Sequence, residues 1–421
     1  MTGTVRADPR RGRGGSRAPG DAVGAGRQAG AGGADGRRIG ARSRRPPVDH
    51  ANGVILLAIV AVLIIVGLVM VLSASSVQSQ REVGSTWSYF GKQLMWVVVS
   101  VGALLATSRL DYRRWTRLSG PFLAACTFLL LVVLVPGVGV EVNGARSWLA
   151  LGPMRMQPSE LVKLAVLLHA ANLLARRYRR MHDWRLTLLP VCVLAGGIAF
   201  LIMLQPDLGT TIVLGSITFA VLFVSGVPML RLAGVGAVGT AGALVLALGK
   251  EYRRNRILSF LDPSKDPLNT GFQLNQSFMG IASGGWTGLG LGESRAKWGF
   301  LPNAHTDFIF AIICEELGLI GALAVVALFL AFAVFGTRAA LMAPDRFGTL
   351  VAAGITAWIL TQAFVNVGGV VGLLPITGLT LPFISFGGTS LLITMAATGV
   401  LVNIARQGRA PRRSPARSAA A

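Results

Sequence analysis

Ten apolar runs dominate this chain, and each is long enough to form a helix that crosses a lipid bilayer. The hydrocarbon core of a bilayer is roughly 30 Å thick, so a spanning helix needs about 20 mostly apolar residues. The runs cover residues 53–73, 89–107, 118–136, 159–175, 187–204, 210–227, 231–249, 308–335, 349–366 and 385–404. Hydrophobic residues make up 52% of the 421 and charged residues only 14%, which excludes an ordinary soluble protein. The sequence therefore predicts an all-α integral membrane protein with ten transmembrane helices.

The basic residues predict how these helices are oriented. The net charge of +22 is high enough for a nucleic-acid-binding protein, but residues 1–49 alone hold eleven Arg against four Asp, and residues 406–421 hold five Arg and no acid. The connections after the even-numbered runs are also basic, through Arg109, Arg113, Arg114, Arg117, Arg176, Arg177, Arg179, Arg180, Arg185, Arg231, Arg338 and Arg346. Because Lys and Arg are enriched in cytoplasmic loops, both termini are expected in the cytoplasm. The charge thus indicates membrane topology, and no nucleic-acid partner is expected.

Three regions follow from this pattern. Residues 1–50 are rich in Gly, Ala and Arg and contain no apolar stretch, so we expect a disordered basic cytoplasmic tail and no cleavable signal peptide. Residues 51–405 form the ten-span membrane domain, and residues 406–421 form a second basic cytoplasmic tail. The three cysteines all lie in apolar runs without metal-ligand spacing, and they imply no disulfide framework.

Four connections are then expected on the extracellular side: residues 137–158, the tight turn at 205–210, the large loop 250–306 between helices 7 and 8, and residues 367–388. The last is too apolar for an ordinary solvated loop. Non-helical backbone at membrane depth persists only where it is buried in protein or lines a cavity, so we expect a partly re-entrant cavity wall there. The Gly-rich stretch 284–292 matches no phosphate-binding or dinucleotide-binding pattern and is expected to be a flexible loop.

Asp307 is the leading candidate for a catalytic residue. It lies where the outer loop that carries Lys297 and His305 enters an apolar run, and ionisable groups at a bilayer boundary are costly to keep there. Asp307 can cap the helix that follows, or it can act as a general base whose pKa is tuned by partial burial; the two roles are compatible. Glu315 and Glu316 lie about 12 Å further along this helix than Asp307, because an α-helix rises about 1.5 Å per residue. They are expected to pair with a basic residue of another helix.

Two further groups of ionisable residues have a structural and a functional interpretation. Asp207 lies between Pro206 and Gly209, a turn signature, with a role in a site as the alternative. Glu160 and Lys163 are three residues apart at the start of a span, where they can pair with each other. An unpaired ammonium in apolar sequence would be expensive. We expect all three ionisable groups to shape a cavity without transferring a proton.

Cations in the outer loops could bind phosphate. Arg146 stands beside Trp148, so its planar guanidinium could hold a phosphate or could anchor the loop at the membrane interface. Arg253, Arg254 and Arg256 form a basic cluster on the side where the topology rule disfavours one. Such a cluster would suit a pyrophosphate lipid, although a solvated surface is the simpler interpretation.

Five motifs together resemble one known family. They are Asn143-Gly-Ala-Arg146-Ser-Trp148, Pro158-Ser-Glu160-Leu-Val-Lys163, Gln205-Pro-Asp207-Leu-Gly-Thr210, His305-Thr-Asp307-Phe-Ile-Phe310 and Leu374-Pro-Ile-Thr-Gly-Leu-Thr-Leu-Pro-Phe-Ile-Ser-Phe-Gly-Gly388. The motifs occur in the order and with the spacing of the SEDS family (shape, elongation, division and sporulation), which they resemble. The resemblance covers about residues 53 to 405 of this chain. The chain is most similar to the division members; the elongation and sporulation types are the alternatives.

The resemblance implies a peptidoglycan glycosyltransferase. Such an enzyme polymerises lipid II, an undecaprenyl-pyrophosphate disaccharide pentapeptide, at the outer face of the bacterial cytoplasmic membrane. The implied partners are a class B penicillin-binding protein, which cross-links the new strand, and other membrane proteins of the division machinery. A lipid II flippase and a non-catalytic scaffold are the competing interpretations, because intramembrane Glu and Lys would also suit transport.

The resemblance also assigns site residues. Asp307 is the implied catalytic base. The candidates for substrate binding are Arg146, Lys163, Glu160, Asp207, Arg295, Lys297, His305 and Ser385. No cofactor is required by the motifs, although a divalent cation such as Mg²⁺ or Mn²⁺ could replace some of the cationic side chains at the leaving pyrophosphate. The chain departs from the family pattern at Gly299 and Thr377, where division members carry an acidic residue and Lys, so supporting roles for those side chains are not carried over.

Overall fold

A computed structural model of the protein describes residues 50–142, 145–152, 154–249, 260 and 271–408. The predicted tails at 1–49 and 409–421 and the cluster of Arg253, Arg254 and Arg256 lie outside the described residues. The elements discussed below all belong to the unit Pro46–Ala421.

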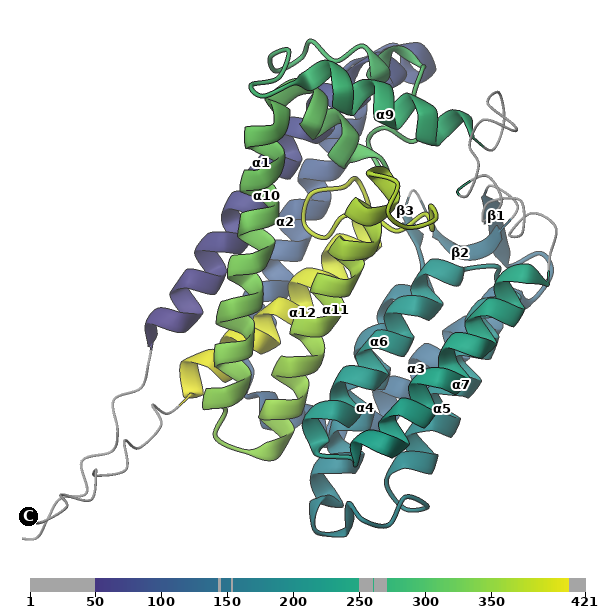
Figure 1. The fold of residues 1–421 in the computed structure, drawn as a ribbon, viewed down its shortest axis with the longest axis vertical. Coiled ribbons are helices and arrows are strands. Elements are labelled where there is room, and N and C mark those ends of the chain that lie inside the picture. Colours follow the sequence, from purple (N-terminus) through teal and green to yellow (C-terminus); the bar gives the residue numbers. More distant parts are fainter. Residues whose placement is uncertain (1–49, 143–144, 153, 250–259, 261–270, 409–421) are drawn as a thin grey trace, which may run out of the picture. The chain divides into compact units, whose positions relative to one another are not determined.

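Helices make up most of this unit (Figure 1). They are α1 (His50–Val83), α2 (Ser88–Arg109), α3 (Trp115–Leu134), α4 (Pro158–Arg176), α5 (Leu188–Leu204), α6 (Leu208–Ser225), α7 (Met229–Leu248), α9 (Phe272–Gly284), α10 (Ile309–Met342), α11 (Arg346–Val370) and α12 (Gly388–Gln407). Short 3-10 turns are η1 (Tyr112–Arg114), η2 (Tyr178–Arg180) and η3 (Ala296–Trp298). Each of the ten predicted spans coincides with one of these helices, and α9 is an additional helix within the large loop.

Eight of the described helices are long and apolar enough to cross a membrane, whereas α5 and the stretch Met229–Val245 of α7 are apolar but shorter. The count of ten crossings therefore stays a prediction. In contrast, α1 has 34 residues, which at about 1.5 Å per residue is longer than a bilayer is thick. Its last turns must extend beyond the hydrocarbon core, on the side where the large loop begins and ends.

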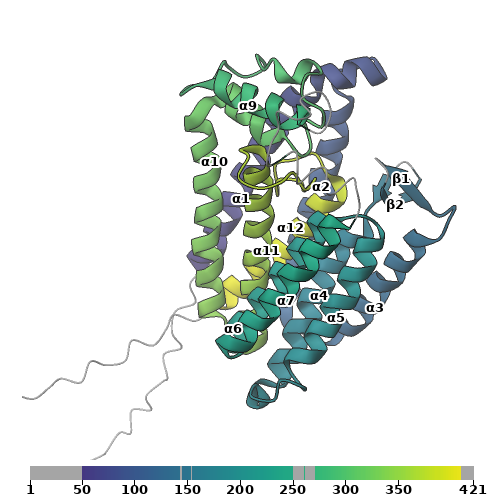
Figure 2. The same cartoon turned by 45° about the vertical axis from the view of Figure 1, so that its right-hand side comes forward.

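The helices α11 and α12 occupy the middle of the bundle (Figures 1 and 2). α11 packs against α10, α6, α4 and α12, and α12 packs along most of α2. The contact between α12 and α2 is close because Gly399 has no side chain: a Cβ there would lie 2.4 Å from the carbonyl oxygen of Leu104. Small residues at such contacts let helix backbones approach, which is how helices associate in a lipid environment.

A three-stranded antiparallel sheet lies in the connection between α3 and α4, and the sequence did not predict it. Its strands are β1 (Gly139–Val142), β2 (Ala145–Leu151) and β3 (Met154–Met156), in the order β1-β2-β3. β2 alternates: Ser147 and Leu149 are buried, whereas Ala150 is exposed. The Ser147 hydroxyl donates to the carbonyl of Gln205 over 3.1 Å, so the sheet rests on the turn between α5 and α6.

α10 is broken at Gly318, and the Gly-rich stretch 284–292 packs into the break. Gly318 has φ 68° and ψ −170°, a conformation open to glycine alone. The freed backbone groups are satisfied by this stretch, since Leu289 N donates to Glu315 O over 2.9 Å and Leu319 N donates to Gly285 O over 2.9 Å. The prediction of a flexible loop at 284–292 is wrong. Its glycines serve close approach: a Cβ at Gly288 would lie 2.1 Å from Glu316 O.

The segment 371–387, between α11 and α12, contains no helix or strand, yet much of it is buried. Leu381, Phe383 and Ile384 are each at most 3% exposed. This agrees with the prediction of non-helical backbone buried in protein, because amides of neighbouring helices satisfy its carbonyl groups.

Candidate functional site

Asp307 lies just before the start of α10, one residue before Phe308, which occupies the N-cap position. The residue is half-buried. Its backbone carbonyl accepts a hydrogen bond of 2.8 Å from Asn366 Nδ2 on α11. Gly378 of the segment 371–387 approaches its carboxylate, since a Cβ at Gly378 would lie 3.6 Å from Asp307 Oδ2. The candidate base is therefore held between the top of α10, α11 and the non-helical segment.

His305 packs among aromatic rings two residues before Asp307. Its imidazole makes edge-to-face contacts with Tyr89 at 5.1 Å and Phe386 at 5.5 Å between ring centroids. Burial lowers the pKa of His305 to about 4, against a smaller opposing effect of Glu82. His305 is thus a neutral residue that joins the loop to α2 and to the segment 371–387. Its Nδ1 has no hydrogen-bond partner among the described residues.

Ser385, a predicted substrate ligand, is engaged within the protein. Its hydroxyl donates to the carbonyl of Thr306 over 2.6 Å and accepts from Leu381 N over 2.8 Å. The backbone nitrogen of Phe386 donates to His305 O over 3.0 Å. These bonds fix the backbone on the N-terminal side of Asp307. In this structure Ser385 supports the site and does not present its hydroxyl to a ligand.

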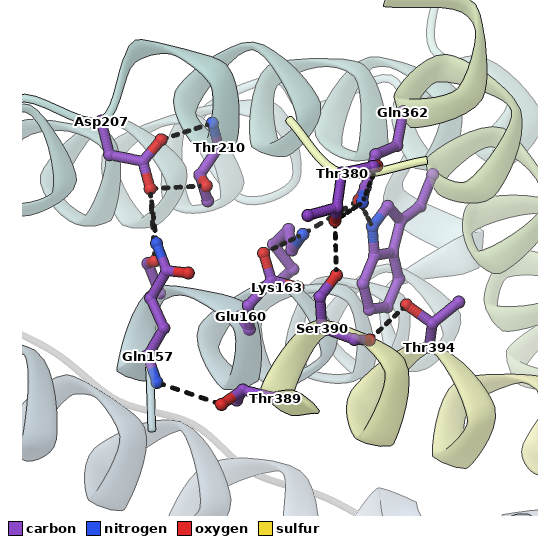
Figure 3. A network of polar contacts seen from close by, with 12 residues as sticks. Gln157, Glu160, Lys163, Asp207, Thr210, Gln362, Thr380, Thr389, Ser390 and Thr394 are labelled. Carbon is purple, nitrogen blue, oxygen red and sulfur yellow. Dashed lines mark hydrogen bonds and ion pairs between the residues drawn. The ribbon is translucent and has the colours of Figure 1, made fainter. Parts of the chain in front are cut away.

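Glu160 and Lys163 form the predicted ion pair, deep in the bundle. Lys163 Nζ lies 2.8 Å from Glu160 Oε1, and the Lys163 side chain is 0% exposed. Gln362 of α11 completes the pair, because its Oε1 accepts from Lys163 Nζ over 3.1 Å and from Trp358 Nε1 over 2.9 Å. The Gln362 amide then donates to the carbonyl of Thr380 over 3.0 Å, which links α4 to the segment 371–387 (Figure 3).

Asp207 caps α6, as its turn signature predicted. Oδ1 accepts from Thr210 N over 2.9 Å, and Oδ2 accepts from Thr210 Oγ1 over 2.7 Å and from Gln157 Nε2 over 3.1 Å (Figure 3). Poor solvation raises the pKa of the Asp207 carboxyl, and nearby Glu160 adds to that effect, while the Thr210 hydrogen bonds and Lys163 oppose it. Every one of these contacts is a link within the fold.

Lys297 also pairs inside the protein. Its Nζ lies 3.6 Å from Glu316 Oε1 on α10, and the Lys297 side chain is only 7% exposed. Ser73 of α1 donates to the same oxygen over 2.5 Å. Glu315 accepts from Arg295 N over 2.8 Å and from Ser294 Oγ over 2.5 Å. Glu316 thus pairs with a basic residue of another helical segment, as predicted, although that segment is the short turn η3, and the acidic pair fastens the loop before η3 onto α10.

Arg146 and Arg295 are the two predicted cations that remain accessible. The side chain of Arg146 is 40% exposed and lies 3.7 Å from Glu141 Oε2 across the β1–β2 pair. The side chain of Arg295 is exposed, without a hydrogen-bond or ion-pair partner among the described residues. Asn143, in the same motif as Arg146, lies outside the described residues.

The predicted residues therefore fall into three groups. Arg146 and Arg295 are accessible, Lys297 fastens a loop onto α10, and Glu160, Lys163 and Asp207 belong to a buried polar network. Asn366, Gln362 and Tyr89 join these groups and were not singled out from the sequence. The two amides had a detectable signal, since polar side chains stand in the apolar run 349–366 four residues apart, or one helical turn. The contacts of Tyr89 with His305 depend on tertiary packing and gave no signal.

The described residues do not form a protein-held metal site. Within the ranges that the structure describes, no three His, Cys, Asp or Glu side chains are grouped so that they could hold an ion. Glu315 accepts hydrogen bonds from Ser294 and Arg295, and Glu316 Oε1 is held by Ser73 and Lys297, whereas Glu316 Oε2 has no hydrogen-bond partner among the described residues.

The chain has extensive sequence similarity to known proteins. Residues 54–410 match the sequence model of the cell cycle protein family of FtsW, RodA and SpoVE. Stage V sporulation protein E of Bacillus subtilis is 40% identical over 355 residues, which cover 84% of this chain and 97% of that protein. The probable peptidoglycan glycosyltransferase FtsW of Mycobacterium tuberculosis is 42% identical over 369 residues, which cover 88% of this chain and 70% of that protein.

Solved structures extend the similarity to the fold. A chain from a peptidoglycan synthase complex, studied for its coordination of polymerization and crosslinking, matches with a TM-score of 0.70 at 32% identity, over 84% of this chain and 97% of that one. The rod shape determining protein RodA of Thermus thermophilus matches with a TM-score of 0.62 at 31% identity, over 84% and 96% of the two chains. The resemblance carried by the five motifs is confirmed, and this chain is a bacterial membrane protein of the FtsW, RodA and SpoVE family.

Proposed function

We propose that this protein is a peptidoglycan glycosyltransferase that polymerises lipid II at the outer face of the cytoplasmic membrane. The observation that carries the proposal is the position of Asp307. It is a half-buried residue at the N-terminal end of the apolar helix α10, and the backbone around it is fixed by α11 and by the segment 371–387. Relatives that are named peptidoglycan glycosyltransferases are about 40% identical over nearly the whole membrane domain.

The reaction needs one base and a stabilised leaving group. As the 4-hydroxyl oxygen of the acceptor sugar attacks the anomeric carbon of the donor, its proton passes to the Asp307 carboxylate. The bond between that carbon and the pyrophosphate oxygen breaks, and undecaprenyl pyrophosphate leaves with the electron pair. Negative charge therefore develops on the pyrophosphate, where fixed cations lower the barrier. Arg146 and Arg295 are the predicted cations that are exposed enough to reach it.

The biological setting follows from the relatives. FtsW proteins recur among them, which favours a role in cell division, with sporulation and elongation as the alternatives. The similarity to a chain of a synthase complex that polymerises and cross-links supports a class B penicillin-binding protein as partner. Other membrane proteins of the division machinery are further expected partners, and the distribution of Arg supports a cytoplasmic position for both termini.

Substitution of the proposed base tests this function. Asp307→Asn preserves the size of the side chain and its capacity to accept hydrogen bonds, but it removes the proton acceptor. The purified variant should form no glycan polymer from labelled lipid II, while its thermal unfolding temperature stays that of the wild type. Substantial polymer from the variant would refute the assignment of Asp307. Translocation of lipid II by the wild type without polymer would identify a flippase, and neither activity would identify a scaffold.

A further inference from the structure

The Asn366 side chain connects two parts of the site that are far apart in the sequence. Its Nδ2 donates to the carbonyl of Asp307 over 2.8 Å and to the carbonyl of Leu379 over 2.7 Å. Asp307 lies two residues before the start of α10. Leu379 belongs to the segment 371–387 and follows Gly378, which approaches the Asp307 carboxylate. One amide group therefore sets the spacing between the carboxyl-bearing residue and the backbone that faces its carboxylate.

The chemistry of the partners fixes the orientation of this amide. Both partner atoms are carbonyl oxygens, which can only accept, so the nitrogen must face them. The Oδ1 atom of Asn366 is left without a hydrogen-bond partner among the described residues, although the residue is only 5% exposed. An unpaired buried acceptor is unfavourable for stability. The site thus keeps both donors engaged at the cost of the acceptor.

Gln362 repeats the arrangement one helical turn earlier on α11. Its Nε2 donates to the carbonyl of Thr380, next to Leu379, and its Oε1 is held by Lys163 and Trp358. Consecutive carbonyls of the segment 371–387 are therefore bound by two amides of one helix. The buried ion pair holds the first amide in place, and the second amide reaches Asp307.

We propose that Asn366 is a positioning residue of the glycosyltransferase, which holds Asp307 at its working distance from residues 378–380. The proposal rests on the proposed function, because it takes Asp307 as the base. Asn366 makes no contact with substrate in this scheme. Its loss should lower kcat, since a base displaced by about 1 Å can lose up to about a hundredfold in rate, while KM for lipid II changes little.

The test compares Asn366→Leu and Asn366→Asp with Asn172→Leu. Leu removes both donors at similar volume, and Asp places two acceptors against two carbonyl oxygens. Asn172 is a matched control, because its Nδ2 also makes one buried and one partly buried hydrogen bond, to Ser119 Oγ over 3.0 Å and to Thr116 O over 2.8 Å, between α3 and α4. Both Asn366 variants should lose at least about tenfold in kcat with KM within about threefold. Asn172→Leu should lower thermal stability without changing kcat per folded molecule.

A second readout separates this proposal from the proposed function. Asp307 is labelled with a water-soluble carbodiimide and an amine, and the modified peptide is quantified by mass spectrometry. Labelling of Asp307 should change in both Asn366 variants and stay at the wild-type rate in Asn172→Leu. Unchanged labelling, or a kcat within twofold of the wild type, would overturn the positioning role. Absence of polymerisation by the wild type would overturn the proposed function, while the labelling comparison would still decide the role of Asn366.

Discussion

Arg146 and Lys297 carry the same charge in two different loops, but their surroundings give them different roles. Lys297 is almost fully buried and is paired with Glu316, so its charge is already used to hold the loop on α10. Arg146 is 40% exposed and has one partner, Glu141, at 3.7 Å. An exposed pair of this kind contributes little to stability, so the guanidinium remains available to a ligand.

Arg146→Ala should therefore reduce polymerisation at least about tenfold, which corresponds to about 1.4 kcal/mol of transition-state stabilisation. The physical reason is the concentrated charge of the leaving pyrophosphate at a poorly solvated surface. The measurement is kcat/KM for lipid II with purified enzyme. Arg179→Ala, an exposed cation of η2 at the opposite end of the bundle, serves as the control and should leave the rate unchanged. Equal and small effects would show that Arg146 does not hold the leaving group.

His305 makes stability depend on pH with a defined sign. Burial lowers its pKa from 6.5 to about 4, so the folded protein binds fewer protons there than the unfolded chain does. The contribution of neutral His305 to stability is complete above pH 6.5 and is lost as the pH falls from 6.5 towards 4, by at most about 3 kcal/mol.

Acidification from about pH 7 to about pH 4.5 should then lower the unfolding temperature of the wild type more than that of His305→Gln, which cannot be protonated. Thermal unfolding in detergent at the two pH values measures the difference. His182→Gln replaces an exposed imidazole and should respond to pH as the wild type does. The same pH response in wild type and His305→Gln would show that His305 is not held neutral.

At the scale of elements, the break in α10 depends on Gly318. A Cβ at this position would lie 2.3 Å from Gly288 N, and its φ of 68° is unfavourable for any other residue. Gly318→Ala should cost at least roughly 1–3 kcal/mol of stability, because the strain adds to the clash. It should also loosen residues 284–292, which a protease or hydrogen exchange would detect.

Gly215 provides the control for that substitution. It lies in the middle of α6 with no atom within 4 Å of a Cβ at that position. Gly215→Ala should leave stability unchanged or raise it by up to about 1 kcal/mol, since Ala is the better helix former. If the two substitutions had equal effects on the unfolding temperature, the break would not be a required feature of the fold.

The elements that sequence could predict are those encoded by local composition. Each apolar run became a helix, because a spanning helix satisfies its own backbone hydrogen bonds and needs only length and hydrophobicity. The sheet at 139–156 gives little local signal, since its strands are short and the alternation of buried Ser147 and Leu149 with exposed Ala150 extends over only a few residues. The break at Gly318 was missed because it exists only through partners about 30 residues earlier in the sequence, at Gly285 and Leu289.

At the scale of the whole molecule, the candidate site could be predicted only in part, for a similar reason. The pair of Glu160 with Lys163 could be predicted because a charge in apolar sequence stands out and demands a partner, whereas the catalytic role of Asp307 stays a prediction. The use of Lys297 as a structural cation and the bridge made by Asn366 depend on which helices are neighbours. No single segment of the sequence determines which helices are neighbours in the bundle, so these two roles could be recognised only in the structure.

The two ends of the bundle also differ in charge, and this difference predicts the topology of the whole protein. At one end, η1, α11 and α12 are joined by Arg113, whose Nε lies 2.9 Å from Asp345 Oδ2 and whose Nη1 donates to Gln407 Oε1 over 3.0 Å. The basic turn η2 lies at this end, and α9 lies at the other with the start of α10 (Figure 1). By the positive-inside rule, the first end is predicted to be cytoplasmic and the site to face outward.

Single cysteines test this orientation in a chain whose three native cysteines, Cys126, Cys192 and Cys314, are replaced by Ala. Ala282→Cys on α9 and Arg180→Cys on η2 both place a thiol at an exposed position, so the two variants differ chiefly in the side of the membrane they report. In intact spheroplasts, an impermeant maleimide should label the cysteine at 282 and leave the one at 180 unlabelled until detergent is added. Labelling before detergent at 180 and not at 282 would invert the topology. The Asp307 end of the bundle would then face the cytoplasm, where chemistry on outward-facing lipid II could not occur.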